Sequence, residues 1–363
     1  MSDAPSSTRR RLVRGALTAG GAAVAAGWAL QHRLVAARRV DDEAMAAEGL
    51  TLPEGIVHHD VDVDDGGRLH VMEAGRGPTV VLVHGFMLSG ALWVHQLRDL
   101  AASRRVLAID LRGHGRSVPG RAGFSDDGDP ADAGTVRAEA RLAARQQGSP
   151  AVRRMARDLL AVLRALEVDD AAVVGHSMGG MVALQLLHDT PLDERARRVR
   201  GAVLVSTTAG PFSRLPGYGR AARLAGPVSA RALDVADRWA MRAVGSDDVR
   251  WWLTRLGFGP DAPAAEVRYA ERLHLATPAA TVGSLLPALA VFDLSRWLGG
   301  MDLPVLVVVG SHDRLTPPRH ARRTVAALPR AELVELARCG HMPMLERRRE
   351  FTRLLEEFTA KIR

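Results

Sequence analysis

From Ile56 onward, short runs of β-branched residues alternate with longer stretches in which apolar residues recur at helical spacing. This alternation is typical of a largely parallel sheet whose strands are joined by helices. The first two runs, 56–63 and 68–73, flank the sequence Asp-Asp-Gly-Gly at 64–67 and predict a hairpin. Later runs predict buried strands at 79–83, 106–109, 171–174, 202–205, 305–309 and 332–336. The pattern therefore predicts an α/β fold with a mostly parallel, eight-stranded sheet and helices on both faces.

Helices are predicted at 152–166, 178–188 and 346–361. Two segments interrupt the alternation. Residues 118–150 are polar and rich in Asp, Gly and Ala, which predicts a flexible loop with a helix near 137–146. Residues 209–298 are rich in Arg, Ala and Leu and are too long for a simple crossover, which predicts an inserted helical lid. The predicted core is therefore formed by 56–208 and 299–363.

The first forty residues form a separate segment. Residues 9–14 read Arg-Arg-Arg-Leu-Val-Arg, and the sixteen residues from 15 to 30 carry no charge. A basic stretch before an apolar one indicates an export signal or a membrane anchor, and the arginine pair before Leu12 and Val13 resembles a twin-arginine signal. We therefore expect a protein of the cell envelope, exported or anchored to the cytoplasmic membrane through residues 9–30. A cleaved signal, a retained anchor and a frayed Ala-rich helix all remain open.

Charge and cysteine content exclude several classes of protein. The formal net charge is +8, but residues 1–40 hold seven arginines against one aspartate, which leaves only +2 for the rest of the chain. Lys361 is the only lysine, so the basic content indicates a coding bias rather than a surface for nucleic acid. Cys339 is the only cysteine, which excludes an internal disulfide and a cysteine-rich zinc site.

A candidate nucleophile stands in Gly175-His176-Ser177-Met178-Gly179-Gly180, between a predicted strand and a predicted helix. A serine on such a sharp turn is lifted from the sheet edge, and flanking glycines let the backbones pass without a Cβ clash. The following helix directs its N-terminus at developing negative charge. Ser177 is therefore the predicted nucleophile.

Serine needs a base, and the base needs a group that orients it. His341 follows the last predicted strand, and Asp313 follows the strand at 305–309. The order Ser177, Asp313, His341 is expected when each residue lies at the carboxyl end of a successive strand, where ligands of open α/β sheets bind. Asp293, near the end of the predicted lid, is the alternative acid.

The backbone N–H groups of Phe86 and Met178 are the predicted oxyanion donors, because the first follows a strand and the second begins a helix. His84 and His114 are interpreted as residues that brace the loops that contain them. His58 and His59 lie next to several aspartates but point to opposite sides of a predicted edge hairpin, so no metal site is predicted.

These motifs resemble the α/β-hydrolase superfamily in order and spacing across about residues 56–361. The resemblance rests on His84-Gly85-Phe86, Asp110-x-Arg112-Gly113-His114-Gly115-x-Ser117, Gly175-x-Ser177-x-Gly179-Gly180, Gly310-x-x-Asp313 and Gly340-His341. The lid passage from Arg268 to Pro278 is similar to actinobacterial members of unassigned substrate. The loop at 118–150 is longer and more polar than usual for the superfamily, and Cys339 stands two residues before the histidine.

Serine at 177 argues against haloalkane dehalogenases and epoxide hydrolases, since these relatives use aspartate there. We predict a serine hydrolase that cleaves a small-molecule carboxylic ester through an acyl-enzyme, without metal or cofactor. An acyltransferase, a perhydrolase of the haloperoxidase type and a carbon–carbon bond hydrolase are alternatives on the same triad. A non-catalytic ligand-binding protein of this fold is the alternative from another class. Trp251 and Trp252 of the lid are the candidate substrate contacts, and the oligomeric state is open.

Overall fold

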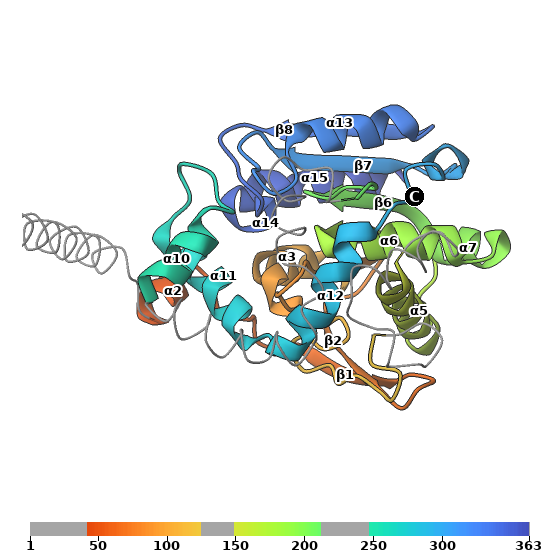
Figure 1. Ribbon diagram of the computed structural model, residues 1–363, viewed down its shortest axis with the longest axis horizontal. Coiled ribbons are helices and arrows are strands. Elements are labelled where there is room, and N and C mark those ends of the chain that lie inside the picture. The colour runs from red at the N-terminus through yellow and green to blue at the C-terminus, as the bar shows by residue number, and fades with distance from the viewer. Residues whose placement is uncertain (1–41, 125–148, 212–246, 363) are drawn as a thin grey trace, which may run out of the picture.

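A computed structural model describes residues 42–124, 149–211 and 247–362 (Figure 1). The predicted signal or anchor at 9–30 lies outside the described residues, as do most of the predicted loop at 118–150 and the helix predicted near 137–146. Of the predicted lid, residues 209–211 and 247–298 are described.

The described strands form one eight-stranded sheet in the order β1-β2-β4-β3-β5-β6-β7-β8. β1 pairs with β2, and β2 with β4, in antiparallel fashion, while every other neighbouring pair is parallel. The predicted hairpin and the mostly parallel sheet are thus confirmed, with several strands longer by up to three residues at one end. The strands are β1 (Val57–Asp62), β2 (Arg68–Ala74), β3 (Thr79–Val83), β4 (Arg105–Ile109), β5 (Ala171–His176), β6 (Val199–Val205), β7 (Val305–Gly310) and β8 (Ala331–Leu336).

Two predicted helices are found nearly as expected, as α5 (Pro150–Ala165) and α6 (Met178–Asp189). The single helix predicted at 346–361 is wrong in one respect. Arg347 leaves helical geometry, with φ −132° and ψ 41°, so the segment divides into α14 (Pro343–Glu346) and α15 (Arg348–Lys361). Helices that were not predicted are α2 (Asp42–Ala47), α3 (Val94–Asp99), α7 (Leu192–Arg198) and α13 (Pro318–Ala327), with 3-10 turns at Gly90–Trp93, Leu100–Ala102 and Leu298–Gly300.

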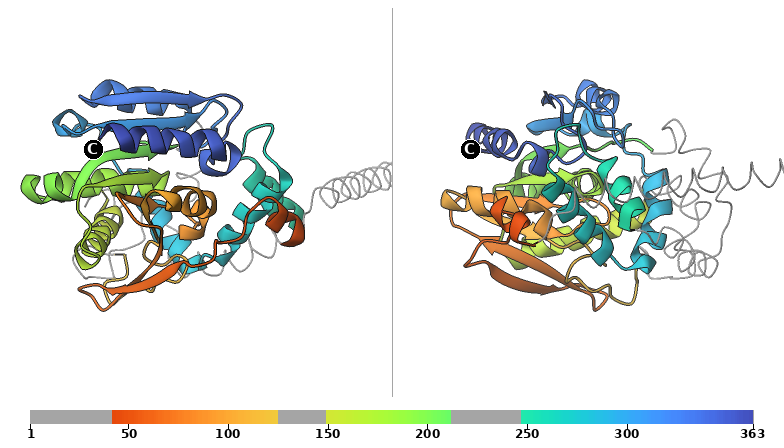
Figure 2. Two further views of the ribbon diagram at one scale, coloured as in Figure 1. Left: turned by 180° about the vertical axis from the view of Figure 1, so that it is seen from behind. Right: turned by 90° about the vertical axis from the view of Figure 1, so that its left-hand side faces the viewer.

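Apolar side chains of the strands point alternately to two cores, one on each face of the sheet. Residues of α5, α6 and α13 line one core, and residues of α3, α14 and α15 line the other. Figure 2 shows α3 and α15 on the face opposite to the view of Figure 1. Because both faces are covered, the central strands are apolar at nearly every position.

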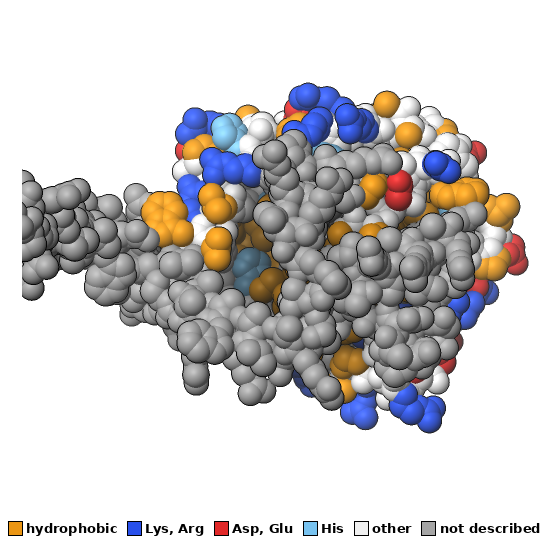
Figure 3. Space-filling model, viewed as in Figure 1, with side chains coloured by type: hydrophobic (Ala, Val, Ile, Leu, Met, Phe, Trp, Pro, Cys, Tyr) orange, Lys and Arg blue, Asp and Glu red, His pale blue; other side chains and the backbone are white. Residues whose placement is uncertain are grey.

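The chain between β6 and β7 contains three described helices, α10 (Asp247–Arg255), α11 (Ala264–Ala276) and α12 (Ala279–Val291). α2 packs against α11, so the described chain begins beside this insertion (Figure 1). Hydrophobic side chains are visible on the surface at the end of the molecule where α10 lies (Figure 3). Within the described residues, no single helix has the length and hydrophobicity to cross a bilayer; α11 and α12 meet that test only as a pair, bent by 100° between them.

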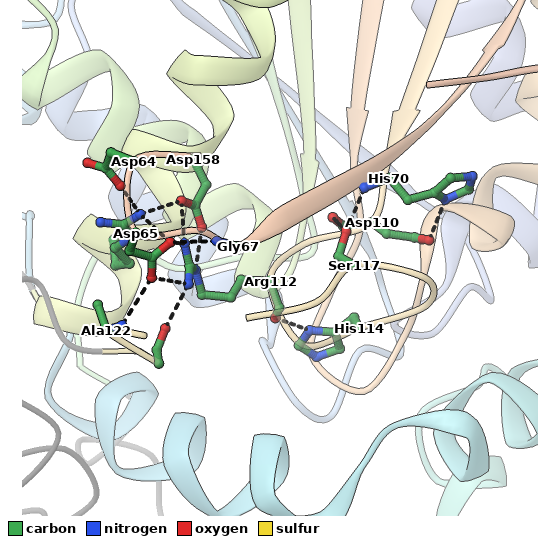
Figure 4. Close-up of polar contacts among 12 residues, drawn as sticks. Asp64, Asp65, Gly67, His70, Asp110, Arg112, His114, Ser117, Ala122 and Asp158 are labelled. Carbon is green, nitrogen blue, oxygen red and sulfur yellow. Dashed lines mark hydrogen bonds and ion pairs between the residues drawn. The ribbon is translucent and has the colours of Figure 1, made fainter. Parts of the chain in front are cut away.

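A fully buried arginine joins the hairpin, the loop after β4 and α5 (Figure 4). The Arg112 guanidinium is 0% exposed and donates to both carboxylate oxygens of Asp158, at 2.6 and 2.9 Å. It also donates to both oxygens of Asp65, at 2.8 and 3.1 Å, and to the Gly123 carbonyl. Although burial alone would raise the pKa of Asp65, the Arg112 hydrogen bonds lower it to about 2. Arg154 contacts Asp64, Asp65 and Asp158 and completes the network.

Replacing Arg112 with leucine is expected to lower the free energy of unfolding by about 3–5 kcal/mol, because two carboxylates would be left without their main buried counter-charge. Urea denaturation followed by circular dichroism measures this change. Arg322→Ala is the control, because Arg322 forms its bidentate pair with Glu335 at the surface, and it should cost far less. Equal losses in the two variants would contradict a structural role for the buried network.

Candidate active site

Ser177 occupies the turn between β5 and α6 in a strained conformation, with φ 51° and ψ −116°. Its N–H donates to the Val205 carbonyl at 2.9 Å, and its carbonyl accepts the Thr207 hydroxyl at 2.6 Å, so the end of β6 and the residues after it hold the turn. A positive φ in a residue other than glycine is costly and marks a position that the surrounding structure enforces. A strained serine turn between a strand and a helix is the geometry expected of the predicted nucleophile.

The glycines around this turn are required by close approach of the backbone. A Cβ at Gly179 would collide with the Val83 carbonyl of β3, and a Cβ at Gly175 would collide with the Gly179 carbonyl. Any larger residue at these positions would push α6 away from the sheet. Backbone packing therefore explains the glycines at 175 and 179, in addition to the role predicted for Ser177 between them.

Asp313 and His341 form a buried pair, with His341 Nδ1 donating to Asp313 Oδ2 at 2.9 Å. Asp313 also accepts the Thr316 hydroxyl at 2.7 Å and the backbone N–H groups of Leu315 and Thr316 at 2.9 and 2.8 Å. Burial would raise the pKa of Asp313, but His341 and these donors outweigh burial and lower it. The carboxylate is therefore held ionised and fixed in orientation, which leaves Nε2 of His341 as the proton acceptor.

His176, the residue before Ser177, links the turn at Ser177 to the loop that contains His341, which we call the histidine loop. Its Nε2 lies 2.9 Å from the His341 carbonyl, and the two rings lie 4.8 Å apart at an angle of 58°. Burial lowers the pKa of His176 well below its usual value, so it is a neutral imidazole that donates through Nε2. The three predicted triad residues are thus brought to one edge of the sheet by β5, β7 and β8.

The predicted oxyanion donors lie beside the nucleophile. A Cβ built on Gly85 would be 3.1 Å from the Ser177 Cβ, which places the Gly85–Phe86 turn against the serine. Within the described residues, neither the Phe86 nor the Met178 N–H has a hydrogen-bond partner. Both are therefore available to an oxyanion at this position.

The contacts of His84 and His114 agree with the predicted role of bracing the loops that contain them. His84 donates from Nδ1 to the Gly85 carbonyl at 2.7 Å and accepts the Leu111 N–H on Nε2 at 2.9 Å. His114 contacts the Arg112 carbonyl at 3.0 Å, and burial lowers its pKa to about 3. In the hairpin, His58 contacts His70 while His59 contacts Glu73, and the described residues hold no group of three or more potential metal ligands.

Glu346 is a site residue that sequence reasoning missed. Its buried carboxylate accepts the N–H of Gly259 at 2.6 Å, of Gly340 at 3.0 Å and of Met342 at 3.1 Å. These amides come from both sides of His341 and from the loop between α10 and α11. Burial raises the pKa of Glu346, and the three amides offset this only in part.

The insertion touches the histidine loop directly. The N–H of His341 donates to the Gly257 carbonyl at 2.6 Å. His274 of α11 contacts the Thr254 hydroxyl of α10 at 3.3 Å, and burial with the nearby charge of His341 lowers its pKa to about 4. α10 and α11 therefore border the proposed catalytic centre.

The lid tryptophans have different surroundings. Trp251 is buried among apolar residues that include Phe258 and Val267, whereas Trp252 is 38% exposed. The alternative acid, Asp293, accepts hydrogen bonds from the backbone and hydroxyl of Ser295 at the surface. It is Asp313, and not Asp293, that the structure places against His341.

Comparison with known proteins agrees with this geometry. A sequence profile described as the alpha/beta hydrolase fold matches residues 78–348. The chain is 25% identical over 306 residues to an AB hydrolase superfamily protein, YisY, of Bacillus subtilis, covering 83% of this chain and 98% of that protein. It is 29% identical over 295 residues to the uncharacterized protein Rv2715 of Mycobacterium tuberculosis, covering 78% and 76% of the two chains.

Among solved structures, the esterase RhEst1 from Rhodococcus sp. ECU1013 superimposes with a TM-score of 0.61 at 25% identity, covering 85% of this chain and 99% of that one. The profile spans more than half of the sequence, and its range includes Ser177, Asp313 and His341. The sheet order, the strained serine turn and the profile together show that the chain belongs to the α/β-hydrolase family.

Proposed function

We propose that this protein is a serine hydrolase that cleaves a carboxylic ester through an acyl-enzyme intermediate. Its family and its hydrolase and esterase relatives support hydrolase activity as the broader statement. The observation that carries the ester proposal is the buried Asp313–His341 hydrogen bond at the sheet edge that also presents Ser177.

In the proposed reaction, His341 Nε2 removes the Ser177 proton while the hydroxyl attacks the ester carbonyl. Asp313 orients the imidazole and stabilises its positive charge. The N–H groups of Phe86 and Met178 bind the oxyanion. His341 then protonates the leaving alcohol, and a water activated by the same residue releases the acid.

Residues 209–298 are proposed to act as a lid. Support comes from the hydrogen bond that the His341 N–H donates to the carbonyl of Gly257, in the loop between α10 and α11. An apolar cover would exclude water from the oxyanion and make a pocket for the acyl chain. Trp251 and Trp252 are the proposed lid residues that contact the substrate.

Two alternatives keep the same triad. An acceptor other than water would give acyl transfer or perhydrolysis, and a different substrate would give carbon–carbon bond hydrolysis. A ligand-binding protein without turnover would need none of the Asp313 contacts described above, which favours an enzyme. Export or anchoring through residues 9–30 is likewise a proposal.

Ser177→Ala is expected to abolish covalent labelling by a fluorophosphonate and to reduce p-nitrophenyl ester turnover by about 10⁴- to 10⁶-fold, because the methyl group keeps the shape but removes the nucleophile. Ser284→Ala, at an exposed serine of α12, is the matched control and should keep both activities. If Ser177→Ala retained more than a tenth of the turnover, Ser177 would not be the nucleophile.

Glu346→Gln is expected to reduce kcat and the rate of fluorophosphonate labelling by roughly ten- to a hundredfold with KM little changed, because the amide cannot accept all three N–H groups and the His341 loop shifts. Steady-state kinetics with a p-nitrophenyl ester measure kcat and KM, and the time course of labelling measures the labelling rate. Thermal unfolding checks that the variant is folded. Glu350→Gln, at an exposed position in the first turn of α15, is the control. A labelling rate equal to that of the wild type would show that Glu346 does not position the histidine.

A further inference from the structure

Five large apolar side chains lie exposed beside the proposed active site, and we call them the α10 surface. Trp252 and Leu253 belong to α10, Leu256 directly follows it, Leu275 lies in the last turn of α11, and Leu315 follows Asp313; their exposed fractions range from 38% to 56%. A Cβ on Gly257 would lie 4.0 Å from Leu315, and the Thr254–His274 contact joins α10 to the end of α11. The residues therefore lie on neighbouring segments of the chain.

The helix α10 is apolar on both sides. Trp251 and Thr254 face inward and are buried, while Trp252 and Leu253 face outward, as does Leu256 directly after the helix. A surface helix of a soluble protein normally has a polar outer side, so this outer side indicates a partner that is itself apolar. Trp and Leu beside arginine are typical of helices that lie in the interface of a bilayer.

Arginines surround the apolar residues. Arg250 and Arg255 belong to the same helix, and Arg314 precedes Leu315. The described acid nearby, Asp261, is paired with Arg338 at 2.5 Å, and the first turn of α10 contains Asp247 and Asp248. Arg255 donates to the Phe258 and Pro260 carbonyls, whereas Arg314 is exposed next to Leu315 and is suited to an anionic lipid headgroup.

The first described residues lie at this same end of the molecule, where α10 lies. The described chain starts at Asp42 in α2, which packs against α11 (Figures 1 and 2). Arg348 holds the turn after α2 through the Glu48 carbonyl at 2.7 Å. The described chain therefore begins next to α11, one of the two helices that contribute to the α10 surface.

We propose that the α10 surface docks on an anionic lipid bilayer and opens the active site toward it, so that the substrates are esters dissolved in the membrane. The substrate part rests on the proposed ester hydrolysis. Leu256 precedes Gly257, which bonds His341, and the Leu315 N–H donates to Asp313 at 2.9 Å. Docking through these residues would place the triad next to the lipid rather than facing bulk water.

The first test places an environment-sensitive thiol label at Leu256→Cys in the full chain. The native Cys339 is fully buried, so the new cysteine reacts selectively. With vesicles of phosphatidylcholine and phosphatidylglycerol, the label should shift to shorter wavelength and be quenched by brominated lipid. Leu192→Cys, on the exposed face of α7, is the matched control and should show neither change even when the whole chain sediments with vesicles.

An unchanged label at position 256 on vesicle-bound protein would overturn the proposal. A shift that depends on protein concentration without lipid would also overturn it, in favour of contact between two copies of the chain. Neither readout needs enzymatic activity.

The second test measures turnover in the double variant Leu253→Asp with Leu256→Asp. Turnover of a lipophilic ester in vesicles should fall at least fivefold further than turnover of soluble p-nitrophenyl butyrate; equal effects on both substrates would contradict docking. If the wild type hydrolysed neither ester, the proposed function would fail, whereas the fluorescence result would still decide the docking.

Discussion

The burial of one guanidinium, that of Arg112, is the constraint on which the catalytic half of the molecule depends. Taking this charge out of water is expensive, and only the full set of acceptors from Asp158, Asp65 and a backbone carbonyl makes it tolerable. The pairing fixes the loop after β4, and that loop donates to His84, which in turn holds the Gly85 carbonyl. The proposed oxyanion donor at Phe86 thus depends on an ion pair between the loop after β4 and α5.

Much of this arrangement could be predicted from the sequence, because it depends on local patterns. Continuous apolar runs identified the strands, and Gly175 and Gly179 identified the turn that presents Ser177. Asp313 and His341 were found from their places after successive strands, since parallel strands end at the same edge of the sheet. These are features in which a few neighbouring residues determine the geometry.

The remainder could not be predicted, because it depends on residues far apart in the chain. Glu346 lies inside a continuous helical pattern of the sequence. No neighbouring residue indicates that its carboxylate accepts hydrogen bonds from the N–H groups of Gly259 and Gly340. His176 reaches the His341 carbonyl across 165 positions of sequence. Short helices such as α3 and α7 carry too few turns for a periodic signal.

The shared carboxylate of Glu346 has a consequence for how this protein can diversify. The backbones of Gly259 and Gly340 approach so closely that a Cβ on either would collide with the other segment. Recombination with relatives could therefore exchange the helices between 264 and 291, while the joint at 257–259 must be inherited together with the histidine loop. New specificities would arise by exchange of the segment 264–291. Crossover points within 257–259 would separate this segment from the histidine loop and yield inactive chimeras.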